Sequence, residues 1–265
     1  MLRALYTSAT GMKAQEMLID NTANNLANVN TTGFKRSHMT FADLLYSTVK
    51  QPGTDVATGQ QTPTGLQIGS GVRAVGTAKV FMPGNAEQTN NPLDVSIEGD
   101  GFFSVQLPNQ QTRYSRAGAF RMDSNGQLVT TDGFLMNPPI TIQNGVDLST
   151  LNIGTDGTVT GSLAGTPDSV VTLGQIQLAR FANPAGLSSE GGNLFAATPA
   201  SGTPTLSNPG TNGMGSLRQG ALEGSNVEVV GELISLISAQ RAYEINSRAI
   251  RAGDEMLSTS AQIVR

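Results

Sequence analysis

Apolar residues near the N-terminus recur at alternating steps of three and four, and this spacing predicts a helix with one apolar stripe. The stripe runs through residues 2–26, and a single polar residue, Glu16, interrupts it. A stripe of this length is typical of a coiled-coil seam, although an amphipathic helix packed on a globular core shows the same pattern. The seam positions that we predict are Leu2, Leu5, Met12, Ile19 and Leu26.

The C-terminal region carries a second stripe with the same spacing. Ser225 and Glu228 are spaced as a capping box, which predicts that a helix starts there. A helix from this point to the end of the chain would have about 40 residues and span roughly 60 Å. Ile234 and Ile237 lie off the seam, so the first half of this helix is apolar on more than one side. The predicted seam positions are Val229, Leu233, Leu236, Tyr243, Ile250 and Leu257.

The middle of the chain has a different pattern. All 12 Pro lie between residues 52 and 209, and only three of the 31 Gly fall within 1–30 or 227–265. Asn-Gly or Asp-Gly pairs separate short apolar runs, as in β-hairpins; they end at Gly126, Gly133, Gly145 and Gly157. The middle is therefore predicted to be an antiparallel sandwich or a barrel-like domain, and residues 51–71 to be either a loop or a long extended hairpin.

Charge and composition narrow the classes of function. The formal net charge is −4, whereas nucleic-acid binding usually needs a basic face, so we expect no nucleic-acid partner. The chain has no Cys, which excludes disulfides and thiolate metal sites. No run of 18 apolar residues is present, so we expect no membrane insertion, and no secretory signal pattern is visible.

Catalytic arrangements are hard to assemble from this sequence. His38 is the only His, so a Ser-His-Asp triad would have to use it, and nothing near it marks a nucleophile. Glu98 and Asp100 are the nearest candidates for the paired carboxylates of a glycan hydrolase acting on the cell wall. Turn formation with the neighbouring Gly99 and Gly101 explains them better. We expect no enzyme, no catalytic residue, no cofactor and no metal site.

Two stretches resemble a known family. Residues 23–35, ANNLANVNTTGFK, are similar to the N-terminal signature of the bacterial flagellar rod and hook proteins, and residues 219–250 are similar to the matching C-terminal signature. Further stretches resemble the branch of that family that builds the distal rod: ALYTSATGMKAQ, FADLLY, GLQIGSGV and QTNNPLDVSIEGDGFF. The hook protein lacks the extra stretch that residues 47–64 supply here. A hook or proximal-rod subunit remains an alternative within the family.

The resemblance implies an α+β fold in which discontinuous terminal helices form a coiled-coil inner domain around a channel and a β-rich domain lies outside. The expected boundaries are 1–30 for the N-terminal helix, 31–84 for a connector with the extended rod-type insert, 85–218 for the outer domain and 219–265 for the capped C-terminal helix. It also implies a rigid, hollow helical homopolymer that crosses the periplasm in the basal body and transmits torque from motor to hook. The implied partners are proximal rod proteins, the hook protein, rod-bushing rings and the flagellar type III export apparatus, which uses no cleaved signal peptide.

Asn residues crowd the end of the N-terminal helix, although Asn is a mediocre helix former. Amides beside a buried seam are costly to leave unpaired, so they would select the one register in which each finds a partner. The alternative is a frayed helix end with its amides in water. Gly33 is placed to end the helix with a positive φ. The predicted register-setting residues are Asn21, Asn24, Asn25 and Asn28, with Gln240, Arg241, Glu244 and Asn246 as partners.

Overall fold

The computed structural model describes residues 2–53, 55–57, 60–61, 63–143, 146, 148–163 and 166–263. The chain forms two compact units. Unit 1 comprises Met1–Leu26, Ser37–Ala78 and Val229–Arg265, and unit 2 comprises Ala27–Arg36 and Lys79–Glu228. The chain is therefore an α+β protein with a helix at each end and β structure between them, as the residue patterns predict.

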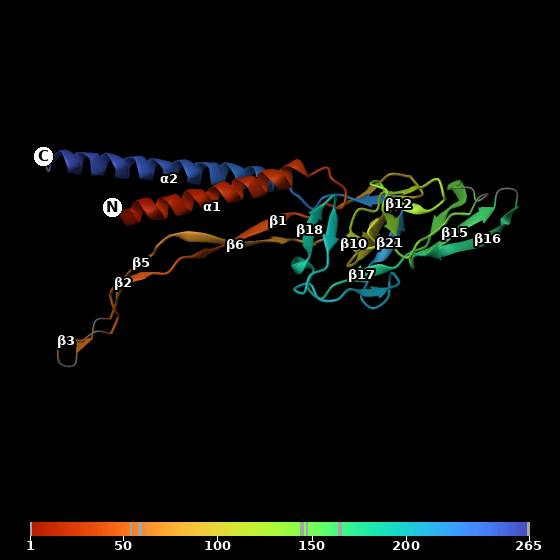
Figure 1. Ribbon diagram of the computed structural model, residues 1–265, viewed down its shortest axis with the longest axis horizontal. Coiled ribbons are helices and arrows are strands. Elements are labelled where there is room, and N and C mark those ends of the chain that lie inside the picture. Colours follow the sequence, from red (N-terminus) through yellow and green to blue (C-terminus); the bar gives the residue numbers. More distant parts are fainter. Residues whose placement is uncertain are drawn as a thin grey trace. The chain divides into compact units, whose positions relative to one another are not determined.

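The two helices of unit 1 are antiparallel. They are α1 (Leu2–Ala27) and α2 (Val229–Ile263), and Figure 1 shows both chain ends at the same end of the pair. A Cβ atom added to Gly11 would lie 3.0 Å from the side chain of Asn246, and one added to Gly253 would lie 2.7 Å from that of Leu5. Numbers that rise along α1 therefore meet numbers that fall along α2, and the helices approach closely where each carries a glycine.

A long two-stranded hairpin completes unit 1 (Figure 1). It pairs β1 (Ser37–Asp43) with β6 (Val72–Lys79), β2 (Ser47–Lys50) with β5 (Leu66–Ile68), and β3 (Asp55–Ala57) with β4 (Gln60–Gln61). The β1–β6 part of the hairpin contacts α1, because the amide of Val72, the first residue of β6, donates to the hydroxyl of Thr10 at 3.4 Å. The extended hairpin, rather than a loop, is thus the correct interpretation of the stretch around residues 51–71.

Unit 2 is built around β9 (Phe102–Gln106). This strand pairs with β10 (Thr112–Ser115) on one side, and with β13 (Leu135–Met136) and β17 (Leu178–Arg180) on the other. The sheet continues outward to β11 (Phe120–Met122) and β12 (Leu128–Thr130) at one side, to β19 (Leu194–Ala196) and β18 (Ser188–Gly191) at the other, and β20 (Thr205–Ser207) pairs with β17. The strand order is open at β11 and β18, so the described residues form no closed barrel and the barrel-like alternative is not borne out.

Unit 2 also contains smaller sheets. They are β14 (Asn152–Ile153), β15 (Thr158–Leu163) and β16 (Thr166–Gln175) in one three-stranded sheet, β8 (Val95–Glu98) with β21 (Ser216–Gln219), and β7 (Ala86–Gln88) with β22 (Ala221–Glu223). Two short 3-10 helices, η1 (Leu148–Thr150) and η2 (Pro184–Gly186), lie in the connections. The β7–β22 and β8–β21 pairs join the start of unit 2's long segment to its end.

Both faces of β9 are buried. Phe103 belongs to the larger apolar cluster, with Val95, Phe120 and Leu178, whereas the adjacent Phe102 belongs to a second, aromatic cluster. Consecutive side chains of a strand point to opposite faces, so this single strand serves both clusters. The predicted turns at Gly126, Gly133 and Gly157 are present with positive φ, and Gly145 lies outside the described residues.

Candidate functional site

The most buried side chains of the helix pair are small or polar. On α1 these are Ala14, Thr22 and Asn25, and on α2 they are Glu232 and Ala239. The glycines of the pair face larger side chains, because Gly253 lies against Leu5 and Gly11 against Asn246. The large apolar residues are covered only in part, and apolar burial contributes about 1 kcal/mol per methyl group, so much of their stabilisation is not realised within one chain.

The large apolar side chains predicted to form the seam lie around this narrow contact. Val229, Leu233 and Tyr243 are exposed, with 40%, 42% and 41% of their surface accessible. The side chain of Leu2 lies outside those that the structure describes. The rest of the predicted seam is half-buried: Leu5, Met12, Ile19, Leu26, Leu236, Ile250 and Leu257.

The first three turns of α2 carry an exposed apolar surface, called here the α2 apolar patch. Val230, Ile234 and Ile237 follow helical spacing along one side, with 63%, 60% and 48% of their surface exposed. Val229 and Leu233 lie beside them. A contiguous exposed patch of β-branched and Leu side chains marks a protein-binding surface more often than it marks free solvent-facing helix.

Asn25 is the amide that joins the elements of unit 1. Its side chain is fully buried; it donates to the backbone oxygen of Ser37 at 2.9 Å and to the carboxylate of Glu232 at 3.3 Å. It also accepts from the amide of Ser37 at 2.9 Å. Asn21 donates to the same oxygen of Ser37 at 2.9 Å. One side chain of α1 thus bonds the first residue of β1 and the first turn of α2.

The other predicted polar residues have different surroundings. Asn28 accepts from the hydroxyl of Thr31 at 3.1 Å, in the turn after α1, and Asn24 is exposed. On α2, Gln240 and Arg241 are exposed.

The remaining partner candidates do not meet the α1 amides either. Glu244 lies 3.6 Å from Arg248 of its own helix, and Asn246 faces Gly11. The partners that Asn25 has, Ser37 and Glu232, are absent from the predicted set. Glu232 carries a sequence signal, because an acidic residue in the first turn of an apolar helix is favoured by the helix dipole.

The predicted helix caps are displaced. Gly33 has φ +71° as expected, but α1 ends at Ala27, so Gly33 does not cap it. A Cβ atom there would lie 2.5 Å from the backbone nitrogen of Ala117, which is why no larger residue fits. Ser225 accepts from the amide of Val227 at 3.3 Å, which closes a tight turn before the helix instead of a capping box.

The segment after Gly33 is held in unit 2 by buried charges. Lys35 is fully buried and lies 2.5 Å from Glu223, which is 2% exposed. Arg116, also 2% exposed, lies 3.4 Å from the other oxygen of the same carboxylate and donates to the backbone oxygen of Gly99 at 2.9 Å. Lys35 donates in addition to the backbone oxygen of Met82 at 2.7 Å. Removing Glu223 would leave Lys35 and Arg116 buried without the carboxylate that both of them contact.

Burial controls the ionisation of this cluster. Burial lowers the pKa of Lys35, and the neighbouring carboxylate of Glu223 opposes that shift. The pKa of Arg116 is lowered for the same reason, opposed by Glu223 and Asp100. The three side chains form a buried network of opposite charges around Glu223, which holds the segment after Gly33 within unit 2.

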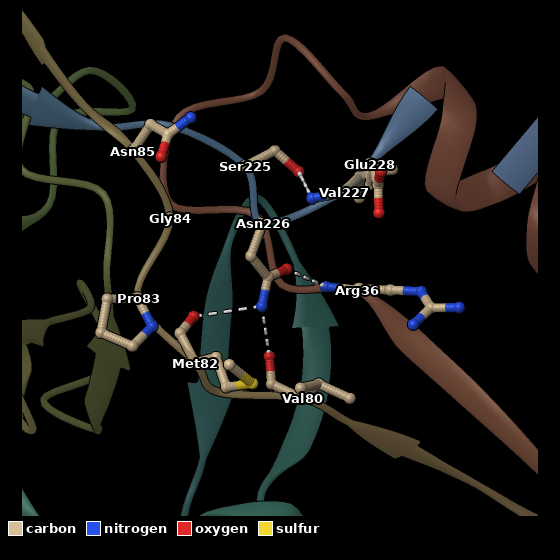
Figure 2. A pocket seen from close by; sticks show the side chains of 10 residues that line it. All are labelled: Arg36, Val80, Met82, Pro83, Gly84, Asn85, Ser225, Asn226, Val227 and Glu228. Carbon is tan, nitrogen blue, oxygen red and sulfur yellow. Dashed lines mark hydrogen bonds between the residues drawn. The ribbon is translucent and has the colours of Figure 1, made fainter. Parts of the chain in front are cut away.

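An open groove lies beside this cluster (Figure 2). Ten residues line it, among them Arg36, Met82, Asn85 and Glu228. The groove brings no acid and base together in the way a hydrolase needs. Glu98, one of the two carboxylates considered for that role, instead lies 3.3 Å from Arg218 and forms an ion pair with it across the β8–β21 pair. His38 is exposed on β1. Among the described residues no group of His, Asp and Glu is arranged to hold a metal ion.

In the described part of the chain, neither helix combines the length and the apolar character that crossing a membrane requires. Unit 1 thus combines a helix pair whose most buried side chains are small or polar with an exposed apolar patch on α2.

Comparison with family models identifies the assembly. A model described as flagella basal body rod protein matches residues 5–35, one described as flagellar hook protein FlgE/F/G D1 domain matches 96–161, and one described as flagellar basal body rod FlgEFG protein C-terminal matches 218–263. These matches fall on α1 with the Gly33–Lys35 segment, on the β unit and on α2. The chain belongs to the flagellar rod and hook protein family, and it is a structural protein of the flagellar rod.

Curated relatives narrow the match to one type of rod protein. The chain is 46% identical to the flagellar basal-body rod protein FlgG of Buchnera aphidicola, over 99% of this chain and 100% of the relative. It is 44% identical to FlgG of Borreliella burgdorferi over the full length of both. FlgG of Bacillus subtilis is 37% identical, again over both full lengths. The chain is thus a structural component of the flagellar basal body, similar to FlgG along its whole length.

Proposed function

We propose that this chain is the subunit of the distal rod and that it polymerises with copies of itself into an open helical tube. The α2 apolar patch is the observation that carries the proposal. Val230, Ile234 and Ile237 remain exposed, and the side chains of the helix pair that are most completely buried are small or polar. A second copy that covers the patch would supply the apolar burial that one chain lacks. The full-length similarity to FlgG proteins supports the distal position.

The contact must be heterologous. A patch on α2 that meets a different surface of the next copy can repeat without limit, and where the rotation between copies does not close into a ring it generates a helix of subunits. The terminal helices, residues 1–30 and 219–265, are then the inner, coiled-coil layer of the tube. Residues 85–218 are the outer domain, and residues 31–84 connect the two with the hairpin. The predicted seam residues and register-setting amides belong to this inner layer.

The hairpin favours a rod over a hook subunit. The pairing of β2 with β5 and of β3 with β4 gives the extra stretch a regular extended structure. We infer that this ribbon stiffens the tube. A proximal-rod or hook subunit is the second candidate, supported by the family models for both rod and hook proteins.

The remaining assignments follow from a distal position. The tube spans the periplasm, meets the proximal rod at one end and the hook at the other, and turns inside the rod-bushing rings. Its subunits leave the cell through the flagellar type III export apparatus without a cleaved signal. Torque passes along the tube, so its subunits must resist shear without performing chemistry.

Replacing one patch residue tests self-assembly. Ile234→Ser should prevent rod formation, because a polar side chain at the centre of a buried apolar contact removes its driving force. Val170→Ser is the matched control, since Val170 is a 69% exposed apolar residue of β16 in unit 2. Cells that carry either variant as their only copy are compared by electron microscopy of isolated basal bodies. Rods in normal number with Ile234→Ser would refute the assignment of the patch.

A further inference from the structure

Three segments of unit 2, at points where the chain enters or leaves that unit, are bonded to one another through two side chains, those of Asn226 and Glu223. The three segments are residues 33–36, 79–84 and 223–228, and all of them lie within unit 2. Each of them continues directly into unit 1 or comes directly from it. The backbone crosses between the units at four points, and three of these crossings lie at the ends of these segments; the fourth joins Leu26 to Ala27. Most of the force carried along the backbone between the units therefore passes through the three segments.

Asn226 bonds all three segments. It lies on the third segment; its side-chain oxygen accepts from the backbone amide of Arg36 at 2.7 Å (Figure 2). Its side-chain nitrogen donates to the backbone oxygens of Val80 at 2.8 Å and Met82 at 3.1 Å. The side-chain amide of Asn226 thus bonds the third segment to both the first and the second. It uses its oxygen as acceptor and both of its N–H groups as donors.

Glu223 repeats the arrangement a short distance away. Its backbone oxygen accepts from Gly33 at 2.8 Å, and its carboxylate accepts from the side chain of Lys35 at 2.5 Å, both on the first segment. The same carboxylate accepts from the amide of Gly84 at 3.1 Å, on the second segment. The first and second segments also bond each other directly, because the amide of Val80 donates to the oxygen of Arg36 at 2.9 Å.

Backbone packing leaves little slack at this point. A Cβ atom on Gly84 would lie 2.1 Å from the backbone oxygen of Gly224, so the second and third segments touch backbone to backbone. The amide of Gly224 also donates to the oxygen of Asn85 at 2.7 Å. Because these bonds and contacts engage main-chain atoms of each segment, they constrain the path of the backbone itself.

We propose that Asn226 and Glu223 form a three-segment clamp that fixes the directions in which the chain leaves unit 2 and so makes the subunit stiff under torque. The proposal rests on the proposed function as a torque-bearing rod subunit. Asn226 and Glu223 are positioning residues: they act through the segments that they hold. The clamp is independent of the α2 apolar patch, which makes contacts between copies.

Amide hydrogen exchange on the purified full chain tests the clamp itself. In Asn226→Ala, the amide of Arg36 should exchange roughly 2- to 12-fold faster, as expected for the loss of its hydrogen bond to the Asn226 side chain. The amide of Val80 should follow in the same direction, because its acceptor is the backbone oxygen of Arg36 and its own oxygen loses the Asn226 donor. Asn226→Asp keeps the acceptor for Arg36 but turns a carboxylate toward the oxygens of Val80 and Met82. It should therefore release the second segment and leave the amide of Arg36 protected.

The control for exchange is Asn183→Ala. Asn183 also donates to a backbone oxygen, that of Ala200 at 3.1 Å, but within a local loop of unit 2. Amides of β9 report whether the core of each variant is intact. Unchanged exchange at Arg36 and Val80 in Asn226→Ala, with an intact core, would overturn the clamp whatever the protein's place in the flagellum.

Cells carrying the variants test what the clamp is for. Asn226→Ala cells should assemble basal bodies in normal number and swim normally in dilute buffer, but lose swimming speed relative to Asn183→Ala cells when the medium is made viscous. Equal loss of speed in both strains would overturn the role in torque while leaving the clamp. Absence of rods in Asn226→Ala alone would also overturn it, because Asn226 would then serve assembly. Failure of the proposed function is read separately, from Ile234→Ser.

Discussion

Asn25→Ala is the substitution that most directly tests how the helix register of unit 1 is set. The Asn25 side chain is fully buried and makes three hydrogen bonds, two with the backbone of Ser37 and one with Glu232. Alanine keeps the helix and fits the space, so the change removes hydrogen bonds without adding strain. The partners that remain decide the cost.

The amide of Ser37 loses the acceptor that Asn25 provides, and an orphaned group of this kind costs about 1–3 kcal/mol. The oxygen of Ser37 keeps the donor of Asn21 at 2.9 Å and so loses little. The carboxylate of Glu232 loses a charge-assisted donor, which is worth about 1.5–3 kcal/mol when both partners are buried. Because the terms overlap, we expect roughly 2–4 kcal/mol per subunit, which is about a 30- to 700-fold change in an equilibrium constant.

Isolated rods provide the assay. Rods of the variant are incubated in a urea series, and the concentration at which half of them dissociate is read by electron microscopy. Asn21→Ala is the matched control, because it replaces the same residue type on the same helix. Asn21 makes a single hydrogen bond, to an oxygen of Ser37 that Asn25 also bonds, so its loss should cost less than about 1 kcal/mol of stability. Equal midpoints for Asn25→Ala and Asn21→Ala would refute the reasoning, because burial and partner number would then have no influence on register.

Two further substitutions test local features of the structure. Gly84→Ala should destabilise unit 2 by about 1–3 kcal/mol in urea unfolding of the full chain, because its Cβ would lie 2.1 Å from the oxygen of Gly224. Gly76→Ala is the control and should leave stability unchanged by contact, because nothing lies within 4 Å of the added Cβ. A hydrogen bond from Thr158 lowers the pKa of Asp156, which adds stability that is present above the ordinary pKa of Asp and lost as the pH falls through the lowered value. Thr158→Val should raise that pKa toward normal in an NMR titration and reduce the loss of stability in acid; an unshifted titration would assign the effect to the backbone amide of Thr158 alone.

The terminal helices and the β-rich middle could be predicted because their signals are local. Helix periodicity without Pro marks both ends, and Asn-Gly or Asp-Gly pairs mark turns such as those at Gly126 and Gly133, where positive φ is required. The start of α2 at Val229 falls just after the predicted cap at Ser225. Whether strands close into a barrel depends on long-range pairing, which turn signals do not encode, and here the sheet stays open.

Most partners of these polar residues could not be predicted because they are main-chain groups; the side chain of Glu232 on α2 is the exception. Asn25 is satisfied chiefly by the backbone of Ser37, and any residue at that position would offer the same two groups. The clamp at Asn226 likewise binds backbone atoms of Arg36, Val80 and Met82. Sequence patterns name donors and acceptors among side chains, whereas main-chain partners become visible only when the fold brings the segments together.

The heptad spacing predicts an apolar stripe on each helix, but a stripe does not indicate what covers it. Within one chain the helices meet along Gly11, Ala14 and Ala239, where small residues allow close approach, and Ile234 and Ile237 face away from that contact. A monomeric protein with this arrangement would bury its small residues and expose its large ones, the reverse of what stabilises a lone helix pair. The arrangement becomes favourable once other copies cover the large residues. The distribution of residue size around α2 is therefore itself an argument that the helix pair completes its core between subunits.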